Sequence, residues 1–374
     1  MLNHNYIYKF YYDWWKNIDK TLFILIIFLF SLGLFFSLVS TSLIASDKLD
    51  TNNYFFFFKH LAYILIGIVV LIFFSSLSEK NLFKYSIYLF FISLFFLFLV
   101  PVLGVEIKGS KRWLELFFLP RFQPVELVKP FIIIFIASIL CSEKKFNIYV
   151  KYLLTFIAII PASLLLIMQP DIGQTLLIFL SWVILVFISG ISLPIILSFF
   201  SFSLFSLVYM VFFISKFSYI KSRILSFINP SEGTHNFQSD KAIDAISSGG
   251  FFGKGVGEGT LKNRVPEAHT DYIVSVISEE FGVVVIILLL LLFLFFIYLV
   301  FKKIYLEKNE KIKLVLTGTI SLIIFQVLIH LGVNIRLFPT TGMTLPFLSY
   351  GGSSIISTSI LAGIILNLTK RKIS

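Results

Sequence analysis

Long apolar runs, separated by short polar stretches, divide most of the chain into ten segments. A helix that crosses a membrane needs about 20 mostly apolar residues. We predict such helices at residues 21–42, 55–77, 83–102, 128–142, 149–168, 172–190, 192–215, 272–301, 311–335 and 349–369. The segment 128–142 is short and contains Lys129 and Pro130, so we expect a non-helical approach segment before it. The pattern predicts an all-α polytopic membrane protein with about ten transmembrane helices.

The composition supports this class and excludes several others. Of the 374 residues, 58% are hydrophobic and only 14% are charged, whereas an ordinary soluble domain has about 25% charged residues. A cytosolic globular enzyme, a disordered chain and a nucleic-acid-binding domain are therefore excluded. The single cysteine, Cys141, excludes an intrachain disulfide and a cysteine-rich metal site. We treat residues 1–374 as one integral membrane domain.

The lysines between the apolar segments predict the orientation, because cytoplasmic loops of membrane proteins are rich in Lys and Arg. With the N-terminus inside, the inner segments contain Lys9, Lys16, Lys20, Lys80, Lys84, Lys144, Lys145, Lys151, Lys302, Lys303, Lys308, Lys311, Lys313, Lys370, Arg371 and Lys372. Both ends of the chain are then cytoplasmic (N-in, C-in), with residues 1–20 as the N-terminal part and residues 216–271 as a large extracytoplasmic loop. This orientation also accounts for most of the net charge of +11.

Four segments that differ from plain membrane helices fall on the outer side in this topology. They are residues 104–127, 169–171, 216–271 and 336–352. Because the orientation comes from charges elsewhere in the chain, their convergence on one side is informative. It predicts that the functional site lies at the outer face.

The first of these segments places four cations in a fairly short outer loop, namely Lys108, Lys111, Arg112 and Arg121. One interpretation is an interfacial helix, with Trp113 and Phe117 in the membrane surface and the cations at lipid phosphates. The alternative is that the cations bind an anionic group such as a pyrophosphate. Glu126 and Lys129 are three residues apart on one helix face and could pair, but an ionisable residue within a membrane is also a site candidate.

Two aspartates stand at the start of apolar segments. Asp171, in Gln169–Asp171, is expected to cap the helix that follows. Asp271 follows a glycine-rich stretch (249–259) and the run Glu267, Ala, His269, Thr, and it could be a cap or a catalytic residue. Its crowded polar surroundings favour catalysis. A continuous helix would place Glu279 about 12 Å along the axis from Asp271, too far for the two to form an acid–base pair at one bond.

The run 267–271 also offers oxygen ligands. Glu267 and Asp271 could hold Mg²⁺ or Mn²⁺ weakly, whereas a tight zinc site is not expected without cysteine or a second histidine nearby.

The last unusual segment, 339–354, combines two prolines, three glycines and several hydroxyls directly before an apolar helix. We predict a re-entrant outer segment beside a polar cavity, since non-helical backbone at membrane depth must be buried in protein or line a cavity. Together with Pro124, it is also compatible with the broken helices of transporters.

These segments together resemble the SEDS family (shape, elongation, division and sporulation) of membrane peptidoglycan polymerases. The matching pieces are KGSKRW with QPVELVK, QPDIGQT, GGFFGKGVGEG with PEAHTDYI and SEEFG, and TTGMTLPFLSYGGSS, in the family's order and spacing. The motifs PEAHTD and TGMTLP are closer to the cell-division member of the family than to its elongation member. The resemblance covers the whole membrane chain.

The resemblance implies a ten-helix fold with an outward-facing active site. It also implies an enzyme that joins lipid II units into glycan strands and releases undecaprenyl diphosphate. The family's essential aspartate matches Asp271, its lysine after QPxEL matches Lys129, and its loop arginine matches Arg112. A glutamate that some division members carry is Asn263 here, and the sequence around Gln238 also departs from the family pattern.

We therefore predict Asp271 as the catalytic residue of an inverting glycosyltransferase. The candidate substrate-binding residues are Lys111, Arg112, Glu126, Lys129, Arg223, Glu267, His269, Ser349 and Tyr350. No organic cofactor is expected, and Mg²⁺ or Mn²⁺ is the candidate metal. The implied location is the bacterial cytoplasmic (inner) membrane at the division septum. The implied partners are a class b penicillin-binding transpeptidase, other membrane proteins of the division machinery and membrane lipids, without nucleic acid.

Two other functions fit the same features. A lipid II flippase also needs a polar cavity and cations for a pyrophosphate, although it would need access from both faces of the membrane. A non-catalytic scaffold that recruits the division machinery would keep its activity in cells without Asp271 and would lose it through changes in the loops or on the helix surfaces.

Overall fold

The computed structural model describes residues 4–41, 54–107, 109–116, 120–143, 146–215, 218–228 and 237–370. The helices and strands are α1 (His4–Asn17), α2 (Lys20–Thr41), α4 (Phe55–Ser76), α5 (Glu79–Leu103), β1 (Val105–Ile107), β2 (Ser110–Trp113), α6 (Pro124–Leu140), α7 (Ile148–Met168), α8 (Ile172–Ile188), α9 (Leu193–Phe213), α10 (Ser218–Ile228), α11 (Phe237–Gly249), the short 3₁₀ helix η4 (Leu261–Arg264), α12 (Ile273–Leu306), α13 (Glu310–Asn334) and α14 (Gly352–Leu368). Each of the ten apolar segments contains a helix.

Seven of the described helices are long and apolar enough to cross a membrane: α2, α4, α5, α7, α9, α12 and α13. The apolar helices α8 and α14 are shorter, with 17 residues each, and α6 also has 17 residues, two of them the charged Glu126 and Lys129. The prediction of an all-α, multi-pass membrane protein is confirmed in this coarse form. Many large apolar side chains on the outside of the bundle are exposed, as expected of helices that face lipid rather than water.

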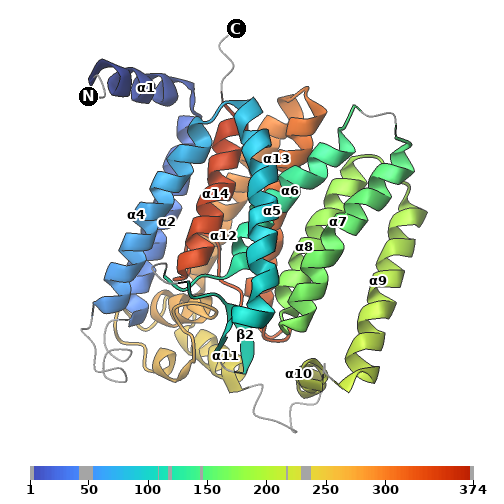
Figure 1. Cartoon of the computed structure of the whole chain (residues 1–374). Coiled ribbons are helices and arrows are strands. Elements are labelled where there is room, and N and C mark those ends of the chain that lie inside the picture. The colour runs from blue at the N-terminus through green and yellow to red at the C-terminus, as the bar shows by residue number, and fades with distance from the viewer. Residues whose placement is uncertain are drawn as a thin grey trace.

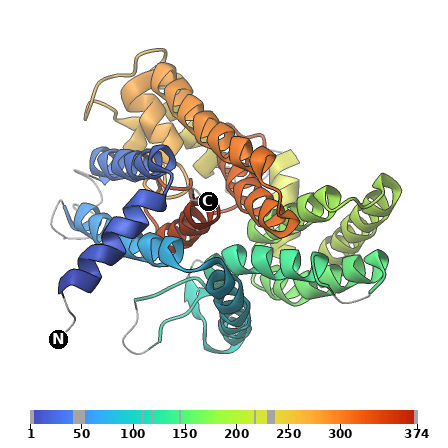
Figure 2. The same ribbon diagram turned by 90° about the horizontal axis from the view of Figure 1, so that it is seen from above.

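Helix α14 lies near the middle of the bundle (Figure 2). Its residues 353–368 are buried except for Ile356, and its most extensive packing partner is α4. Small residues permit this close approach. A Cβ on Gly363 would lie 2.8 Å from the side chain of Phe74, and a Cβ on Gly67 would lie 2.5 Å from the hydroxyl of Ser359. By contrast, α9 stands at the edge of the bundle, with few buried residues.

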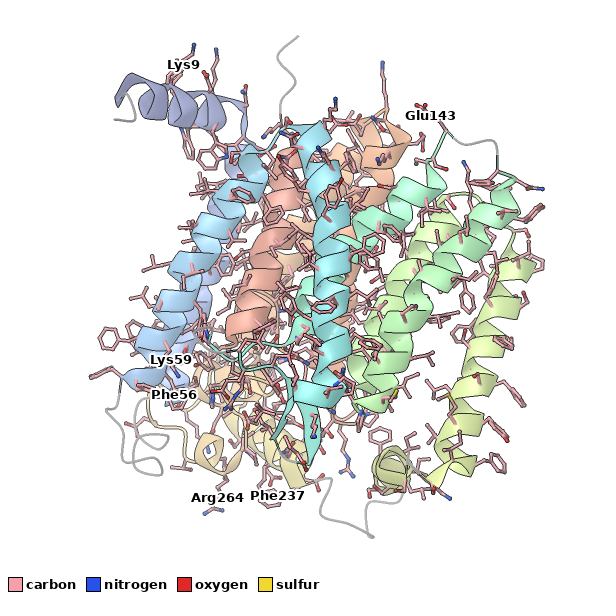
Figure 3. All side chains as sticks on the ribbon, viewed as in Figure 1. Lys9, Phe56, Lys59, Glu143, Phe237 and Arg264 are labelled. Atoms are coloured by element: carbon pink, nitrogen blue, oxygen red, sulfur yellow. The ribbon has the colours of Figure 1, made fainter. Side chains whose placement is uncertain are left out.

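The two ends of the bundle differ in what covers them. Helix α1 lies across one end, and the C-terminal end of α14 is at that same end (Figure 1). The β-hairpin, α10 and α11 gather at the opposite end. Lys9 and Glu143 mark the first end, and Phe56, Lys59, Phe237 and Arg264 mark the second (Figure 3). The segments predicted to converge therefore do lie at one end, which is called the site end below.

Local structure at the site end differs from expectation in two places. Strands β1 and β2 pair as an antiparallel hairpin, in which Ile107 pairs with Ser110, instead of an interfacial helix. Gly109 adopts φ +76° between the strands, which glycine tolerates in a tight turn. The predicted long loop 216–271 is partly helical, because it contains α10, α11 and η4.

The segment between α13 and α14 is non-helical and packs inside the protein. The ring of Phe347 contacts the rings of Phe30 on α2 and Phe296 on α12, with centroid distances of 5.2 and 5.7 Å. A Cβ on Gly33 would lie 2.5 Å from the carbonyl oxygen of Phe347. This burial agrees with the predicted re-entrant segment, since irregular backbone in such a place needs protein around it.

Candidate active site

A cavity of about 300 Å³ opens at the site end of the bundle. It is lined by Ile107, Ser110, Arg112 and Trp113 from the hairpin, Gln123 and Glu126 from the start of α6, Gln238 from α11, Glu267 and Thr270–Tyr272 before α12, Val333 from α13, and Thr340–Thr344, Tyr350, Gly351, Ser353 and Ser354 before and in α14. Three of the four unusual segments thus line one cavity. The fourth, 169–171, accepts a hydrogen bond from the Arg112 side chain. Polar groups converging on a pocket are typical of a substrate site.

Asp271 lines this cavity and does not stand at the N-cap position of a helix. Helix α12 begins at Ile273, and its N-cap is Tyr272, which makes no side-chain capping bond. Asp271 instead ends a turn that begins at Glu267, whose φ is +57°, and its backbone N–H donates to the Glu267 carbonyl at 3.1 Å. Asp271 therefore does not occupy the N-cap position of α12.

Asp271 and Arg112 approach each other across Gly342. A Cβ built on Gly342 would lie 3.6 Å from Oδ2 of Asp271 and 3.8 Å from Nη1 of Arg112. The two atoms are consequently separated by no more than the sum of these distances. Gly342 itself has φ +72°, a conformation that a residue with a Cβ adopts only with strain.

The guanidinium of Arg112 is oriented by the turn between α7 and α8. Its Nε donates to the carbonyl of Gln169 at 3.1 Å, and its Nη2 donates to the carbonyl of Pro170. Its Nη1 lies 3.7 Å from Oδ2 of Asp171. A fork of fixed donors suits such multiple contacts, so Arg112 presents its charge to the cavity from a fixed position.

Asp171 caps α8, as predicted. Its carboxylate accepts a hydrogen bond from the Gln174 backbone N–H at 3.5 Å and another from Gln123 Nε2 at 3.2 Å. Burial raises the pKa of the Asp171 carboxyl, and the charge of Arg112 opposes this shift. Next to it, Gly173 lets the 340–344 segment approach, because a Cβ there would lie 2.7 Å from Cβ of Thr341.

Glu126 lines the cavity and forms a buried ion pair with Lys129, with 2.8 Å between the ammonium and the carboxylate. The carboxylate also accepts from Gln174 Nε2 at 3.1 Å, and the ammonium of Lys129 lies 3.5 Å from Oε1 of Gln326. Lys129 is 0% exposed and does not line the cavity, whereas Glu126 does. The predicted pairing is confirmed, but Lys129 lies behind Glu126 and does not face the cavity.

The hairpin separates two cations that the sequence grouped together. Neighbouring side chains of a strand point to opposite sides, so Ser110 and Arg112 line the cavity while Lys111 between them is exposed. Arg121 pairs with Glu115 at 2.9 Å on the surface. Lys108 lies outside the described residues, and the side chain of Arg223 on α10 is likewise not described. Of the predicted cation cluster, the structure brings Arg112 to the cavity.

Of the remaining candidates, Glu267 and Tyr350 line the cavity. His269 packs its ring against those of Phe56 and Tyr350, at centroid distances of 5.1 and 5.6 Å, and does not line the cavity. Ser349 is buried and donates to the Thr270 carbonyl at 2.7 Å. Direct substrate contact is therefore not supported for His269 and Ser349.

The balance of charge in the cavity also differs from expectation. Among its described lining residues, Arg112 is the one cation, against the carboxylates of Glu126, Glu267 and Asp271. The rest of the polar lining consists mainly of hydroxyls and amides, from Ser110, Gln123, Gln238, Thr270, Tyr272, Thr340, Thr341, Thr344, Tyr350, Ser353 and Ser354. Most of the hydroxyls belong to segments singled out in the sequence; Gln123 begins the motif QPVELVK, and Gln238 lies where the sequence departs from the family pattern.

The glycine-rich stretch 249–259 contacts α12 and not the cavity. Helix α12 is interrupted at Gly282 (φ +78°), where a continuous helix was predicted. The stretch fills the break: the N–H of Val283 donates to the carbonyl of Gly250 at 3.0 Å. A Cβ on Gly282 would lie 2.2 Å from the carbonyl oxygen of Phe251. These glycines therefore serve close backbone packing.

The same stretch surrounds two buried carboxylates, those of Glu279 and Glu280. Oε1 of Glu279 accepts from the Leu261 backbone N–H at 2.9 Å and lies 3.4 Å from the Lys254 ammonium. Oε2 of Glu280 accepts from the backbone N–H of Gly257. Both carboxylates are thus part of the packing of the 249–261 segment on α12, which agrees with the prediction that Glu279 is not an acid–base partner of Asp271.

Comparisons with known proteins identify the family. Residues 20–373 match the model of the FtsW/RodA/SpoVE family, which is described as cell cycle protein. The chain belongs to this family. Among curated relatives, "Probable peptidoglycan glycosyltransferase FtsW" of Caulobacter vibrioides is 31% identical over 368 residues, covering 96% of this chain and 91% of the relative. The protein of the same name from Nitrosomonas europaea is 33% identical over 363 residues, covering 94% and 92%.

Solved structures agree with this assignment. A chain from a peptidoglycan synthase complex, described as coordinating polymerization and crosslinking, superimposes with a TM-score of 0.77 and 27% identity, over 94% of this chain and 97% of that one. The rod shape determining protein RodA of Thermus thermophilus superimposes with a TM-score of 0.68 at 27% identity, over 94% and 96%. The predicted SEDS family, with a closer similarity to FtsW, is confirmed.

Proposed function

We propose that this protein is a peptidoglycan glycosyltransferase that polymerises lipid II into glycan strands during septal cell-wall synthesis. The observation that carries the proposal is the cavity that contains Asp271 beside Arg112. Membership of the FtsW/RodA/SpoVE family and the names of the curated relatives support the same activity.

In the reaction, the Asp271 carboxylate accepts the proton of the sugar 4-hydroxyl on the acceptor lipid II. The oxygen forms a bond to the anomeric carbon of the donor and inverts it. The bond from that carbon to the diphosphate breaks, and undecaprenyl diphosphate leaves with the electron pair. Proton removal by a positioned carboxylate contributes about 10²–10⁴-fold to a rate, and the fixed guanidinium of Arg112 is placed to stabilise negative charge that develops nearby.

The polar lining fits a sugar, whose hydroxyl groups pair with hydroxyl and amide side chains. A diphosphate fits this lining less well, because three carboxylates face one arginine among the described lining residues. Mg²⁺ or Mn²⁺ would neutralise this charge, and the carboxylates of Glu267 and Asp271 are the hard oxygen donors that such ions prefer. Among the described residues, no group of three or more His, Cys, Asp or Glu side chains is arranged to hold a metal. Oxygens of the substrate would complete the coordination.

The site end of the bundle faces outward in the proposed arrangement. Both termini are cytoplasmic, ten helices cross the bacterial inner membrane, and the loop 216–271 is extracytoplasmic. The lysine-rich inner loops and the placement of α1 and the end of α14 opposite the cavity support this orientation. The proposed partner is a class b penicillin-binding transpeptidase, in line with the crosslinking activity named for the related synthase complex.

The test uses the purified full-length protein, with and without a cognate transpeptidase, given fluorescent lipid II and Mg²⁺ or Mn²⁺. The products are resolved on a gel for the wild type, Asp271→Ala and Asp244→Asn. Asp244 lies on α11 and pairs with Lys241 at 3.0 Å on the surface, so its variant controls for the loss of an aspartate near the site end. The proposal expects a ladder from the wild type and Asp244→Asn but not from Asp271→Ala.

A different result would favour one of the other functions. If no condition yields a ladder while Asp271→Ala moves lipid II across liposomes as the wild type does, the protein is a transporter. If Asp271→Ala supports division in cells as well as the wild type, the scaffold function is favoured.

A further inference from the structure

Three consecutive backbone carbonyls, ending at Asp271, are each held by a donor from the C-terminal part of the chain. The carbonyl of His269 accepts from the Tyr350 N–H at 3.0 Å. The carbonyl of Thr270 accepts from the Ser349 hydroxyl at 2.7 Å. The carbonyl of Asp271 accepts from Nδ2 of Asn334 at 3.1 Å. The peptide segment that carries the aspartate is therefore attached along its whole length to α13 and the segment before α14.

Asn334 joins three elements at this point. It is the last residue of α13 and is 0% exposed. Its Nδ2 donates to the carbonyl of His330 at 2.9 Å as well as to that of Asp271, while its Oδ1 accepts from the N–H of Ser275 at 3.3 Å. One side-chain amide thus ties the end of α13 to Asp271 and to the first turn of α12.

We propose that Asn334 is a positioning residue, which holds the backbone of Asp271 so that its carboxylate points into the cavity. This inference rests on the proposed function of Asp271 as the base. The peptide group before Asp271 is fixed by its N–H bond to Glu267, and the peptide group after it is fixed by Asn334. With both groups fixed, the carboxylate can vary its position through only two side-chain torsions.

Loss of the Asn334 amide would free this arrangement. The Asp271 carbonyl is partly buried, and a carbonyl shielded from water without a donor is unfavourable, so the Asp271 peptide would turn towards another partner. A shift of about 1 Å in a reacting group can lower a rate by about 10²-fold. The predicted effect is therefore on catalysis and not on substrate affinity, which depends on the many other groups of the cavity.

Asn367 provides a matched control at the opposite end of the bundle. It lies on α14, is 6% exposed, and its Nδ2 donates to the carbonyls of Phe74, Ser75 and Leu77 at 2.9, 3.1 and 2.7 Å. It is the same type of residue, is buried, and forms the same kind of bond as Asn334. It differs in that its bonds go to the end of α4 and the residue after it, and not to Asp271.

The experiment compares Asn334→Leu with Asn367→Leu, because leucine has a similar size and no hydrogen-bonding group. Thermal unfolding in detergent, kcat and KM for lipid II, and hydrogen exchange of the backbone amides are measured for both and for the wild type. We expect Asn334→Leu to lower kcat by about 10- to 100-fold with little change in KM, and to accelerate exchange at residues 271–275. Asn367→Leu should leave kcat and this exchange unchanged while lowering thermal stability to a similar extent.

The outcomes separate this inference from the function on which it rests. A wild type that forms no polymer refutes the proposed function, and the exchange at 271–275 still tests whether Asn334 holds Asp271. A polymerising wild type with normal kcat in Asn334→Leu, or with unchanged exchange, overturns the positioning role alone. If Asn334→Leu does not fold, Asn334→Asp takes its place with the same expectations, since it keeps the size and an oxygen for the Ser275 N–H but lacks the N–H groups that donate to the carbonyls of His330 and Asp271.

Discussion

Two segments of this protein, Gln169–Asp171 and Glu267–Asp271, each place an aspartate directly before an apolar helix at the same end of the bundle. Asp171 is 2% exposed, caps α8 and lies beside Arg112. Asp271 stands one residue before the N-cap of α12, which is Tyr272, and it lines the cavity. The same residue type in a similar sequence context therefore has two roles. The difference lies in the backbone: the turn at Glu267 places Asp271 two residues before the helix, whereas Asp171 immediately precedes α8.

Exchanging each carboxylate for an amide should separate the two roles most clearly. We expect Asp271→Asn to lower the rate of lipid II polymerisation by about 10²–10⁴-fold with unchanged thermal stability, because the amide cannot accept the proton. Asp171→Asn should retain most of the rate, since the amide oxygen can still cap α8. The rates are compared by product ladders over time. Equal losses in the two variants would contradict the assignment of Asp271 as the base.

Arg112 contacts Asp171 and lines the same cavity as Asp271, so its replacement should affect both stability and activity. Arg112→Ala removes the charge beside buried Asp171, and we expect a loss of about 1.5–3 kcal/mol in the free energy of unfolding, the range for hydrogen bonds to charged groups. Arg112→Ala combined with Asp171→Ala should recover part of that stability but none of the activity. A double-mutant cycle on unfolding in detergent measures the coupling. Purely additive losses would show that the pair at 3.7 Å is not coupled.

Gly342 tests how closely Asp271 and Arg112 must approach. Gly342→Ala would place a methyl group at ordinary contact distance from both side chains, at a φ of +72°. We expect the free energy of unfolding to fall by about 1–2 kcal/mol, because alanine is strained in the left-handed conformation. KM for lipid II should change little. Thermal unfolding and steady-state kinetics provide the check. A variant as stable as the wild type would argue against this backbone conformation.

The smallest expected effect is on the pH dependence of stability. Burial raises the pKa of Asp171 above its ordinary 3.8, so this carboxyl favours folding in its protonated form. The stability that the protonated carboxyl contributes is fully present below pH 3.8, and it is lost as the pH rises through the higher pKa that Asp171 has in the folded protein. The difference in Tm between the wild type and Asp171→Asn should therefore fall as the pH rises from 4 to 7. Asp244→Asn is the control, and a difference that stays constant with pH would refute the shift.

The sequence predicted the large features of the fold because hydrophobic length is a strong signal. Each of the ten apolar segments contains a helix, and the four unusual segments meet at one end. The break of α12 was missed, since Gly282 stands in a continuous apolar helical pattern and its left-handed conformation depends on contact with the 249–259 stretch. The hairpin was missed because two short strands carry almost no periodic signal.

The candidate site was predictable where residue type and local context agree. Asp271, Arg112, Glu126, Glu267 and Tyr350 line the cavity. Four other residues were predicted to bind substrate but do not line the cavity, namely Lys111, Lys129, His269 and Ser349. The direction of a side chain depends on strand alternation and packing, which a sequence motif does not contain. Asn334 had no signal at all, since its role comes from a bond between residues 63 positions apart.

The interrupted helix α12 has a consequence for the order in which this protein assembles. At Gly282 the chain cannot satisfy its own backbone groups, and the N–H groups of Val283 and Val284 instead donate to Gly250 and Phe251. In a lipid environment such groups are unfavourable without partners. The stretch 249–259 precedes α12 in the chain and is synthesised before it. We therefore expect α12 to reach its final shape only after that stretch has docked, which makes this docking a late step in the maturation of the site.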